Sequence, residues 1–175
     1  MSRLLLASLL LLLSHLGLQP AAARELKIGV SQYPPTMNPM TAASVSLSLV
    51  NGMTRRPVTL YDQAWTLVCG LCVTLPTLEN GLAKREALAG GGEGIAITYQ
   101  LRPEATWGDG TPVTSADVVF TWEVGRHPQS GVVSGEGWRR ILSIDVVDAK
   151  TFVLHVDRVT FDYNAFGIAL LPAHL

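Results

Sequence analysis

Two cysteines separated by two residues are the one feature of this sequence that could support a reaction. Cys69 and Cys72 form a C-x-x-C pair, the spacing of redox-active dithiols in which a helix N-terminus lowers the pKa of one thiol. Such a pair should follow a strand and open a helix. Leu67 to Leu75 is instead apolar and partly β-branched, with Pro76 directly after it. We expect a structural disulfide, and buried thiols or a redox pair stay open as alternatives.

Two carboxylates, Asp109 and Asp117, could form a pair for acid–base catalysis. A structural role is favoured, because Asp109 lies between two glycines and Asp117 stands three residues into an expected helix start. The histidines are scattered without ligand spacing, and a C-x-x-C zinc site needs two further ligands. Gly90 to Gly94 lacks the Lys and Ser or Thr of a phosphate-binding loop. The sequence predicts no enzyme, no metal site and no cofactor.

The segment from Tyr99 to Glu123 contains the strongest local structure signals. Apolar side chains occupy every second position from Ile95 to Leu101, which is typical of a strand with one buried face. The run Trp107 to Gly110 predicts a tight turn, since glycine permits backbone angles that a Cβ forbids. A helix should begin after this turn.

The start of that helix is marked by four residues. Thr114 is the expected N-cap, and Asp117 completes a capping-box-like pair with it. Val113 and Val118 stand at the two positions of a hydrophobic staple. Several independent signals therefore predict the same helix boundary.

Other elements are predicted from shorter patterns. We expect a strand at Leu26 to Val30, one or two strands within residues 58–74, and a hairpin tip at Gly90 to Gly92 that leads into the strand ending at Arg102. Residues 41–53 fit either a strand or a helix ended by a glycine cap at Asn51-Gly52. Three further segments complete the set: a loop at residues 126–137, a hairpin of residues 144–147 and 151–156, and a solvated connection without a binding role at Arg55-Arg56-Pro57.

The central segment resembles that of the family 5 extracellular solute-binding proteins, which are the peptide-, oligopeptide- and nickel-binding proteins of ABC importers. In that family a Leu-Arg, an aromatic residue, an Asp-Gly-Thr-Pro-Val-Thr and an Asp-Val-aromatic recur in this order. This chain carries them as Leu101-Arg102, Trp107, Asp109-Gly110 to Thr114, and Asp117 with Phe120. Further matching segments are Leu26 to Pro39, Leu78 to Leu82 and Leu171 to His174. The C-x-x-C pair departs from the family pattern.

The resemblance implies an α/β fold of the type II periplasmic-binding-protein kind, a mixed sheet with hairpins and packed helices. Residues 24–175 would be the amino-terminal part of a two-lobed protein, because members of the family are far longer. It favours a helix for residues 41–53 and implies that Ala43, Ser44 and Val45 contact ligand. Trp138 is a further candidate for ligand contact, because it lies in a loop region.

The first residues are expected to be a secretory signal peptide, residues 1–23. Arg3 precedes an apolar run from Leu4 to Leu13, and small residues end at Ala23. The run is shorter than the ~20 residues of a membrane span, and no cysteine stands at the cleavage site. We expect an exported, periplasmic protein without a lipid anchor, and an uncleaved anchor is the alternative.

The charge balance gives no reason to expect nucleic acid as a partner. Without Arg3, 12 basic residues stand against 14 acidic ones, a formal net charge of −2. The resemblance implies a monomer that captures a solute, expected to be a peptide, for an ABC permease in the inner membrane. The family's anchor for the peptide amino group lies beyond Leu175, so weak binding is expected of this chain alone. An exported dithiol protein acting through Cys69 and Cys72, or an inactive truncated fragment, are the alternatives.

Overall fold

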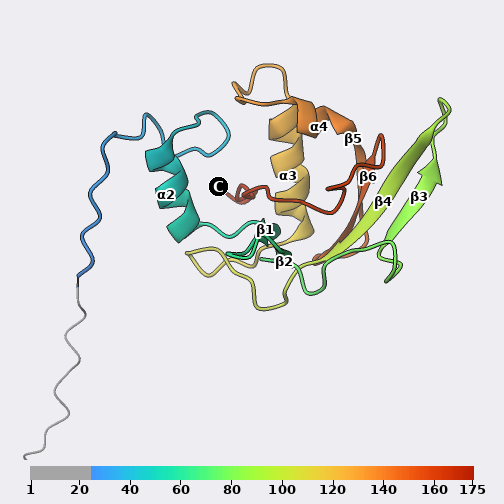
Figure 1. Ribbon diagram of the computed structural model, residues 1–175, viewed down its shortest axis with the longest axis horizontal. Coiled ribbons are helices and arrows are strands. Elements are labelled where there is room, and N and C mark those ends of the chain that lie inside the picture. The colour runs from blue at the N-terminus through green and yellow to red at the C-terminus, as the bar shows by residue number, and fades with distance from the viewer. Residues whose placement is uncertain (1–24) are drawn as a thin grey trace, which may run out of the picture. The chain divides into compact units, whose positions relative to one another are not determined.

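The computed structural model describes residues 25–175 (Figure 1). The expected signal peptide therefore lies outside the described residues. The chain divides into two units, residues 1–30 and 31–175, and the helices and strands described below belong to the second. Among the described residues, no helix combines the length and apolar character needed to cross a bilayer.

The predicted strand at Leu26 to Val30 is wrong. Residues 25–30 have no regular secondary structure, and Leu26 is 81% exposed. Alternation shows which side chains a strand could bury, but a strand also needs a neighbour for its N–H and C=O groups. This segment pairs with no strand among the described residues.

A four-stranded antiparallel sheet forms the centre of the second unit. Its order is β3-β4-β6-β5, with β3 at Ala83–Ala87, β4 at Glu93–Gln100, β5 at Ile141–Val146 and β6 at Thr151–Val156. Both predicted hairpins are confirmed. Gly91 and Gly92 form the first tip with φ values of 86° and 94°, a region that side chains with a Cβ rarely occupy.

One face of this sheet carries the core. Tyr99 and Phe152 are paired residues on β4 and β6, and their rings stack with centroids 5.5 Å apart. Phe166 packs against both rings. The Tyr99 hydroxyl donates to the carbonyl of Asn164 at 2.9 Å, and burial raises the pKa of this hydroxyl. The predicted alternation of buried side chains on β4 is confirmed, since its inward residues are at most 1% exposed.

Two short strands stand apart from this sheet. β1 at Thr59–Tyr61 and β2 at Leu67–Cys69 form an antiparallel pair, which confirms the strands expected between residues 58 and 74. The Asp62 side chain closes their turn by accepting the N–H groups of Ala64 and Thr66.

Helix α3, Ser115–Arg126, begins where the sequence predicts. Thr114 is its N-cap, and the Thr114 N–H donates to Asp117 Oδ2 at 2.7 Å. Val113 and Val118 are both buried, as expected of a staple. Figure 1 shows α3 beside the four-stranded sheet.

Two further helices each correct one expectation. α2 spans Val45–Thr54 with Ser44 as its N-cap, but no glycine cap ends it, because Gly52 is helical and the chain leaves the helix at Arg55. α4 spans Glu136–Arg140, so Trp138 lies in a helix and not in a loop. An acidic first turn and a basic last turn stabilise this short helix.

The C-terminal segment, residues 157–175, follows β6 and runs between α2 and α3 (Figure 1). The Leu171 N–H donates to Thr121 Oγ1, and the Ala173 N–H donates to Asp117 Oδ1, both at 2.8 Å. Asp117 Oδ2 also accepts the indole N–H of Trp107 at 3.3 Å. One buried carboxylate thus joins the turn, the helix start and the C-terminal segment.

We expect Asp117→Asn to lower the free energy of unfolding by about 2 kcal/mol, because an amide supplies one acceptor oxygen where the carboxylate supplies two to these donors. Urea unfolding followed by circular dichroism measures the change. Glu123→Gln is the matched control, since Glu123 is exposed on the same helix and accepts no such set of donors. A loss of equal size in both variants would contradict the role given to Asp117.

We expect Gly125→Ala to destabilise the chain by about 1–3 kcal/mol, because a Cβ at Gly125 would lie less than 3.0 Å from ring carbons of Trp138. Gly52→Ala is the control. Gly52 is also helical, but a Cβ there meets nothing within 4 Å, so alanine should stabilise by up to about 1 kcal/mol. Thermal melting compares the two, and a neutral Gly125→Ala would show that the α3–α4 contact is loose.

Candidate functional site

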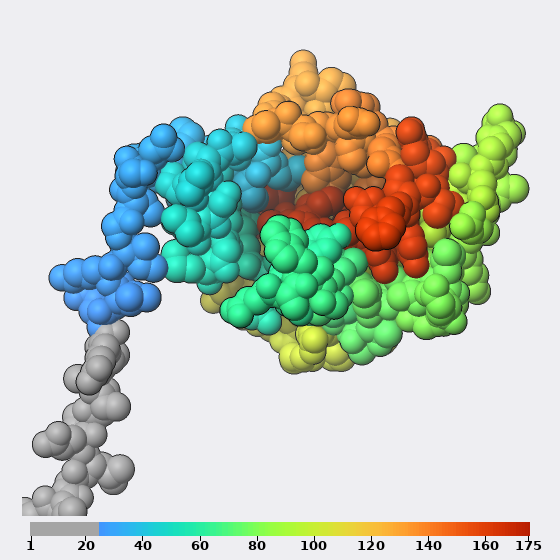
Figure 2. Space-filling view, in the orientation of Figure 1, coloured from blue at the N-terminus to red at the C-terminus, as the bar shows by residue number. Residues whose placement is uncertain are grey.

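A cavity of about 560 Å³ opens between α2, the C-terminal segment and the loop before α4. Figure 2 shows the hollow, with teal α2 on one side, the orange segment near residue 135 above it and red C-terminal residues at its floor. The volume falls in the range of small-molecule sites in proteins. It is larger than four further cavities in the part of the chain that the structure describes.

The lining of the cavity is mainly apolar, with a few polar groups. Met40, Val132 and Ile168 contribute apolar surface, and Ser48 and Asn51 contribute polar groups from one side of α2. The complete lining is Pro39, Met40, Ala42, Ala43, Ser48, Asn51, Gly52, Arg55, Pro57, Val132, Val133, Ser134, Trp138, Gly167, Ile168 and Ala169. Apolar walls with a few fixed polar groups are typical of a site for an organic solute.

Two of the four predicted ligand-binding residues line this cavity. Ala43 lies just before α2, and Trp138 reaches the cavity from α4, where it is 7% exposed. Ser44 and Val45 lie outside the lining: the Ser44 hydroxyl accepts the N–H of Leu47 at 3.2 Å, and Val45 is 74% exposed. Contact of these four residues with a ligand stays a prediction.

Arg55 is a cavity residue that the sequence patterns missed. The Arg55-Arg56-Pro57 run is solvated only in part, because Arg55 is half-buried and its Nη1 donates to the carbonyl of Leu170 at 3.3 Å. No local pattern could have indicated this, since the two residues are 115 positions apart.

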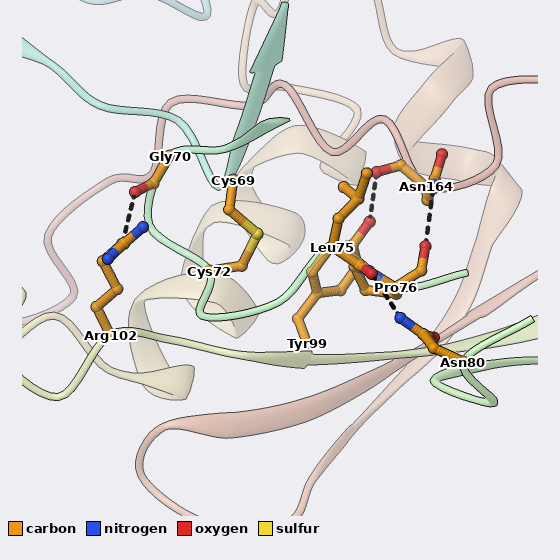
Figure 3. The surroundings of a disulfide bond; sticks show 9 residues. All are labelled: Cys69, Gly70, Cys72, Leu75, Pro76, Asn80, Tyr99, Arg102 and Asn164. Carbon is orange, nitrogen blue, oxygen red and sulfur yellow. Dashed lines mark hydrogen bonds between the residues drawn. A yellow bond between two sulfur atoms is a disulfide. The ribbon is translucent and has the colours of Figure 1, made fainter. Parts of the chain in front are cut away.

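The Cys69–Cys72 pair is a disulfide in the structure, as expected (Figure 3). Cys69 is the last residue of β2. Cys72 is buried, and its backbone pairs with that of Leu101 in an isolated antiparallel β-bridge. The Arg102 Nε donates to the carbonyl of Gly70 at 3.2 Å, which fixes the loop between the two cysteines. Neither cysteine opens a helix, the placement that a redox-active pair requires.

The motif residues Trp107, Asp109, Gly110, Thr114 and Asp117 form a structural cluster. Asp109 Oδ1 accepts the N–H of Thr111 at 2.8 Å, and its Oδ2 lies 2.7 Å from His174 Nε2. The hydrogen bond with His174, followed by the backbone N–H of Thr111, lowers the pKa of Asp109 to about 2. Asp109 and Asp117 therefore bond to different partners, which supports the structural role expected of both.

The outer face of the sheet carries one further group of titratable side chains. His155 Nδ1 lies 2.9 Å from Glu86 Oε2, and its Nε2 lies 3.3 Å from Asp145 Oδ2. His155 faces away from the core, on the side of β6 opposite Phe152 and Leu154. Within residues 25–175, no cluster of His, Cys, Asp and Glu has the arrangement of a metal site.

Comparison with known proteins gives a consistent result. The family model described as bacterial extracellular solute-binding proteins, family 5 Middle, matches residues 77–175. An uncharacterized lipoprotein of Mycobacterium leprae is 33% identical over 92 residues, which are 49% of this chain and 17% of that protein. A putative ABC transporter peptide-binding protein of Brucella ovis is 27% identical over 127 residues, or 73% of this chain and 21% of that protein.

Solved structures show the same fold. The oligopeptide-binding protein of Thermus thermophilus, complexed with a pentapeptide, is 26% identical with a TM-score of 0.67, over 75% of this chain and 22% of that one. Haemophilus influenzae OppA is 18% identical with a TM-score of 0.62, over 81% and 29% of the two chains. The predicted periplasmic-binding-protein fold is confirmed. The expected mixed sheet is not, because every strand pair within residues 25–175 is antiparallel. The chain spans about a fifth of the length of the curated relatives it matches.

We expect His174→Ala to raise the pKa of Asp109 from about 2 toward its ordinary value of 3.8, because the hydrogen bond with His174 is the main cause of the lowering. Carbon NMR of the carboxyl groups from pH 2 to 6 measures the pKa of Asp109 in the wild-type chain and in the variant. Asp148 is the internal control, since its pKa is lowered chiefly by the backbone N–H of Lys150. An unchanged Asp109 titration would show that the pair does not form in solution.

The same hydrogen bond predicts a pH dependence of stability. A carboxyl whose folded pKa is depressed stabilises the fold above its unfolded pKa, and the contribution disappears as pH falls through the folded value. The wild-type chain should therefore exceed Asp109→Asn in stability above about pH 4, and the difference should shrink as pH approaches about 2. Urea unfolding at several pH values measures the difference, and one that is independent of pH would contradict the account.

Proposed function

Since the chain belongs to the bacterial extracellular solute-binding proteins of family 5, we propose that it captures peptides for an ABC importer. The solute would occupy the cavity beside α2 and be released unchanged to a permease of the inner membrane. The protein would act as a monomer in the periplasm after removal of a signal peptide at residues 1–23. No catalytic step is part of this proposal.

The cavity is the observation that carries the proposal. It lies in a chain of a solute-binding family, it is walled by α2 and the C-terminal segment, and Ala43 and Trp138 line it. Two similar proteins support peptide as the solute: the Brucella ovis protein is named as peptide-binding, and the Thermus thermophilus protein was solved with a pentapeptide.

The proposed mechanism is closure of two lobes around the solute. Residues 24–175 would belong to the first lobe and supply one wall of the site. A ligand that binds the closed form more tightly than the open form shifts the population toward closure. Peptide main chains can be bound through hydrogen bonds that do not depend on side-chain identity, and water can fill pockets around variable side chains.

We expect tri-alanine to shift the amide NMR signals of Ala43 and Gly167 in a saturable way, at millimolar concentration, because in the proposed mechanism residues 24–175 supply one wall of a site between two lobes. Ala43→Leu places extra atoms in the cavity and should weaken binding at least about tenfold. Ala64→Leu is the control, since Ala64 is exposed in the β1–β2 turn and lies outside the lining.

Two results would contradict the proposal. The first is a set of shifts confined to residues outside the cavity lining. The second is chemical change of the tripeptide on incubation, measured by mass spectrometry, because the proposed function leaves the solute intact.

A further inference from the structure

We infer that Arg55 binds a carboxylate of the solute, so that this site takes peptides with a free C-terminal carboxylate and discriminates against amidated ones. The inference rests on the proposed function, because it concerns the same cavity. Beyond the proposed function, it specifies that the ligand carries a negatively charged group and that Arg55 binds this group.

The position of Arg55 is set by two walls of the cavity. Its backbone N–H donates to the carbonyl of Asn51 at 2.8 Å and closes the last turn of α2. Its guanidinium reaches across to the C-terminal segment, where Nη1 donates to the carbonyl of Leu170 at 3.3 Å. Leu170 is 3% exposed and directly follows the lining residues Gly167 to Ala169. Arg55 therefore lies between this cavity and a neighbouring one of about 160 Å³ that Leu170 also lines, and its guanidinium is held there rather than extended into solvent.

The charge of Arg55 has no partner among residues 25–175. Ion pairs within 4.0 Å are found there for Arg85, Arg102, Arg140 and Arg158, and none is found for Arg55. The described cavity lining contains no Asp, Glu, Lys or His, so Arg55 alone gives it a net charge of +1. A half-buried cation without a counter-ion is costly, and an anionic ligand group would reduce this cost.

The chemistry of the guanidinium identifies the ligand group. Its planar set of N–H donors matches a carboxylate in a bidentate arrangement, and the bond to Leu170 uses only one of them. Ser48, Asn51 and Ser134 line the same cavity and offer further polar contacts. A ligand ammonium near Arg55 would be repelled, so the carboxylate end of a peptide is the end that fits here.

Binding of tri-alanine and tri-alanine amide to the purified chain tests the inference by NMR titration. The wild-type chain should bind the acid at least about tenfold more tightly than the amide, because a charge-assisted bidentate pair contributes about that much. Arg55→Gln should bind both peptides with equal, weak affinity. Arg56→Gln is the matched control: it removes the same charge one residue away, at an exposed side chain outside this lining, and should keep the preference for the acid.

The outcomes separate the two proposals. Equal binding of acid and amide by the wild-type chain, or a preference that survives in Arg55→Gln, overturns the role of Arg55 and leaves solute binding intact. Absence of shifts at the cavity lining with either peptide, at concentrations up to tens of millimolar, overturns the proposed function and the inference with it. Heteronuclear spectra of each variant without ligand verify that the fold is retained.

Discussion

The buried carboxylate of Asp117 is the group on which the arrangement of this chain depends. It is 3% exposed, and its two oxygens accept N–H groups from Trp107, Thr114 and Ala173. These donors belong to a turn, a helix start and a C-terminal segment that has no helix or strand of its own. A buried carboxylate with several donors stabilises such a junction, whereas the same charge without donors would destabilise it.

The cavity beside α2 depends on this junction through the continuity of the chain. Thr121, one turn further along α3, accepts the N–H of Leu171, so the C-terminal segment is fixed at two points. Residues 167–169 of that segment form one wall of the cavity, and the carbonyl of Leu170 fixes Arg55 at its edge. The motif around Asp117 therefore acts on the cavity from a distance, by holding the segment that forms its wall.

Local patterns predicted the fold where the stabilising contacts are themselves local. The capping pair of Thr114 and Asp117 and the alternation along β4 lie within a few residues, and both are confirmed. Distant contacts left no such pattern. Lys150 donates to the carbonyls of Arg102, Ala105 and Val113, and nothing near it in the sequence indicates this. The same reason explains which cavity residues could be predicted. Ala43 and Trp138 were candidates from the sequence, but Arg55 was not, because its guanidinium is positioned by the carbonyl of Leu170, 115 residues along the chain.

The central claim is that the cavity beside α2 holds an unmodified solute. Intermolecular nuclear Overhauser effects between isotope-labelled protein and unlabelled tri-alanine test it most directly. The account predicts cross-peaks from the peptide to the Ala43 methyl group and to the Trp138 indole, which both line the cavity. A bound peptide whose cross-peaks arise only from residues outside the lining would contradict it.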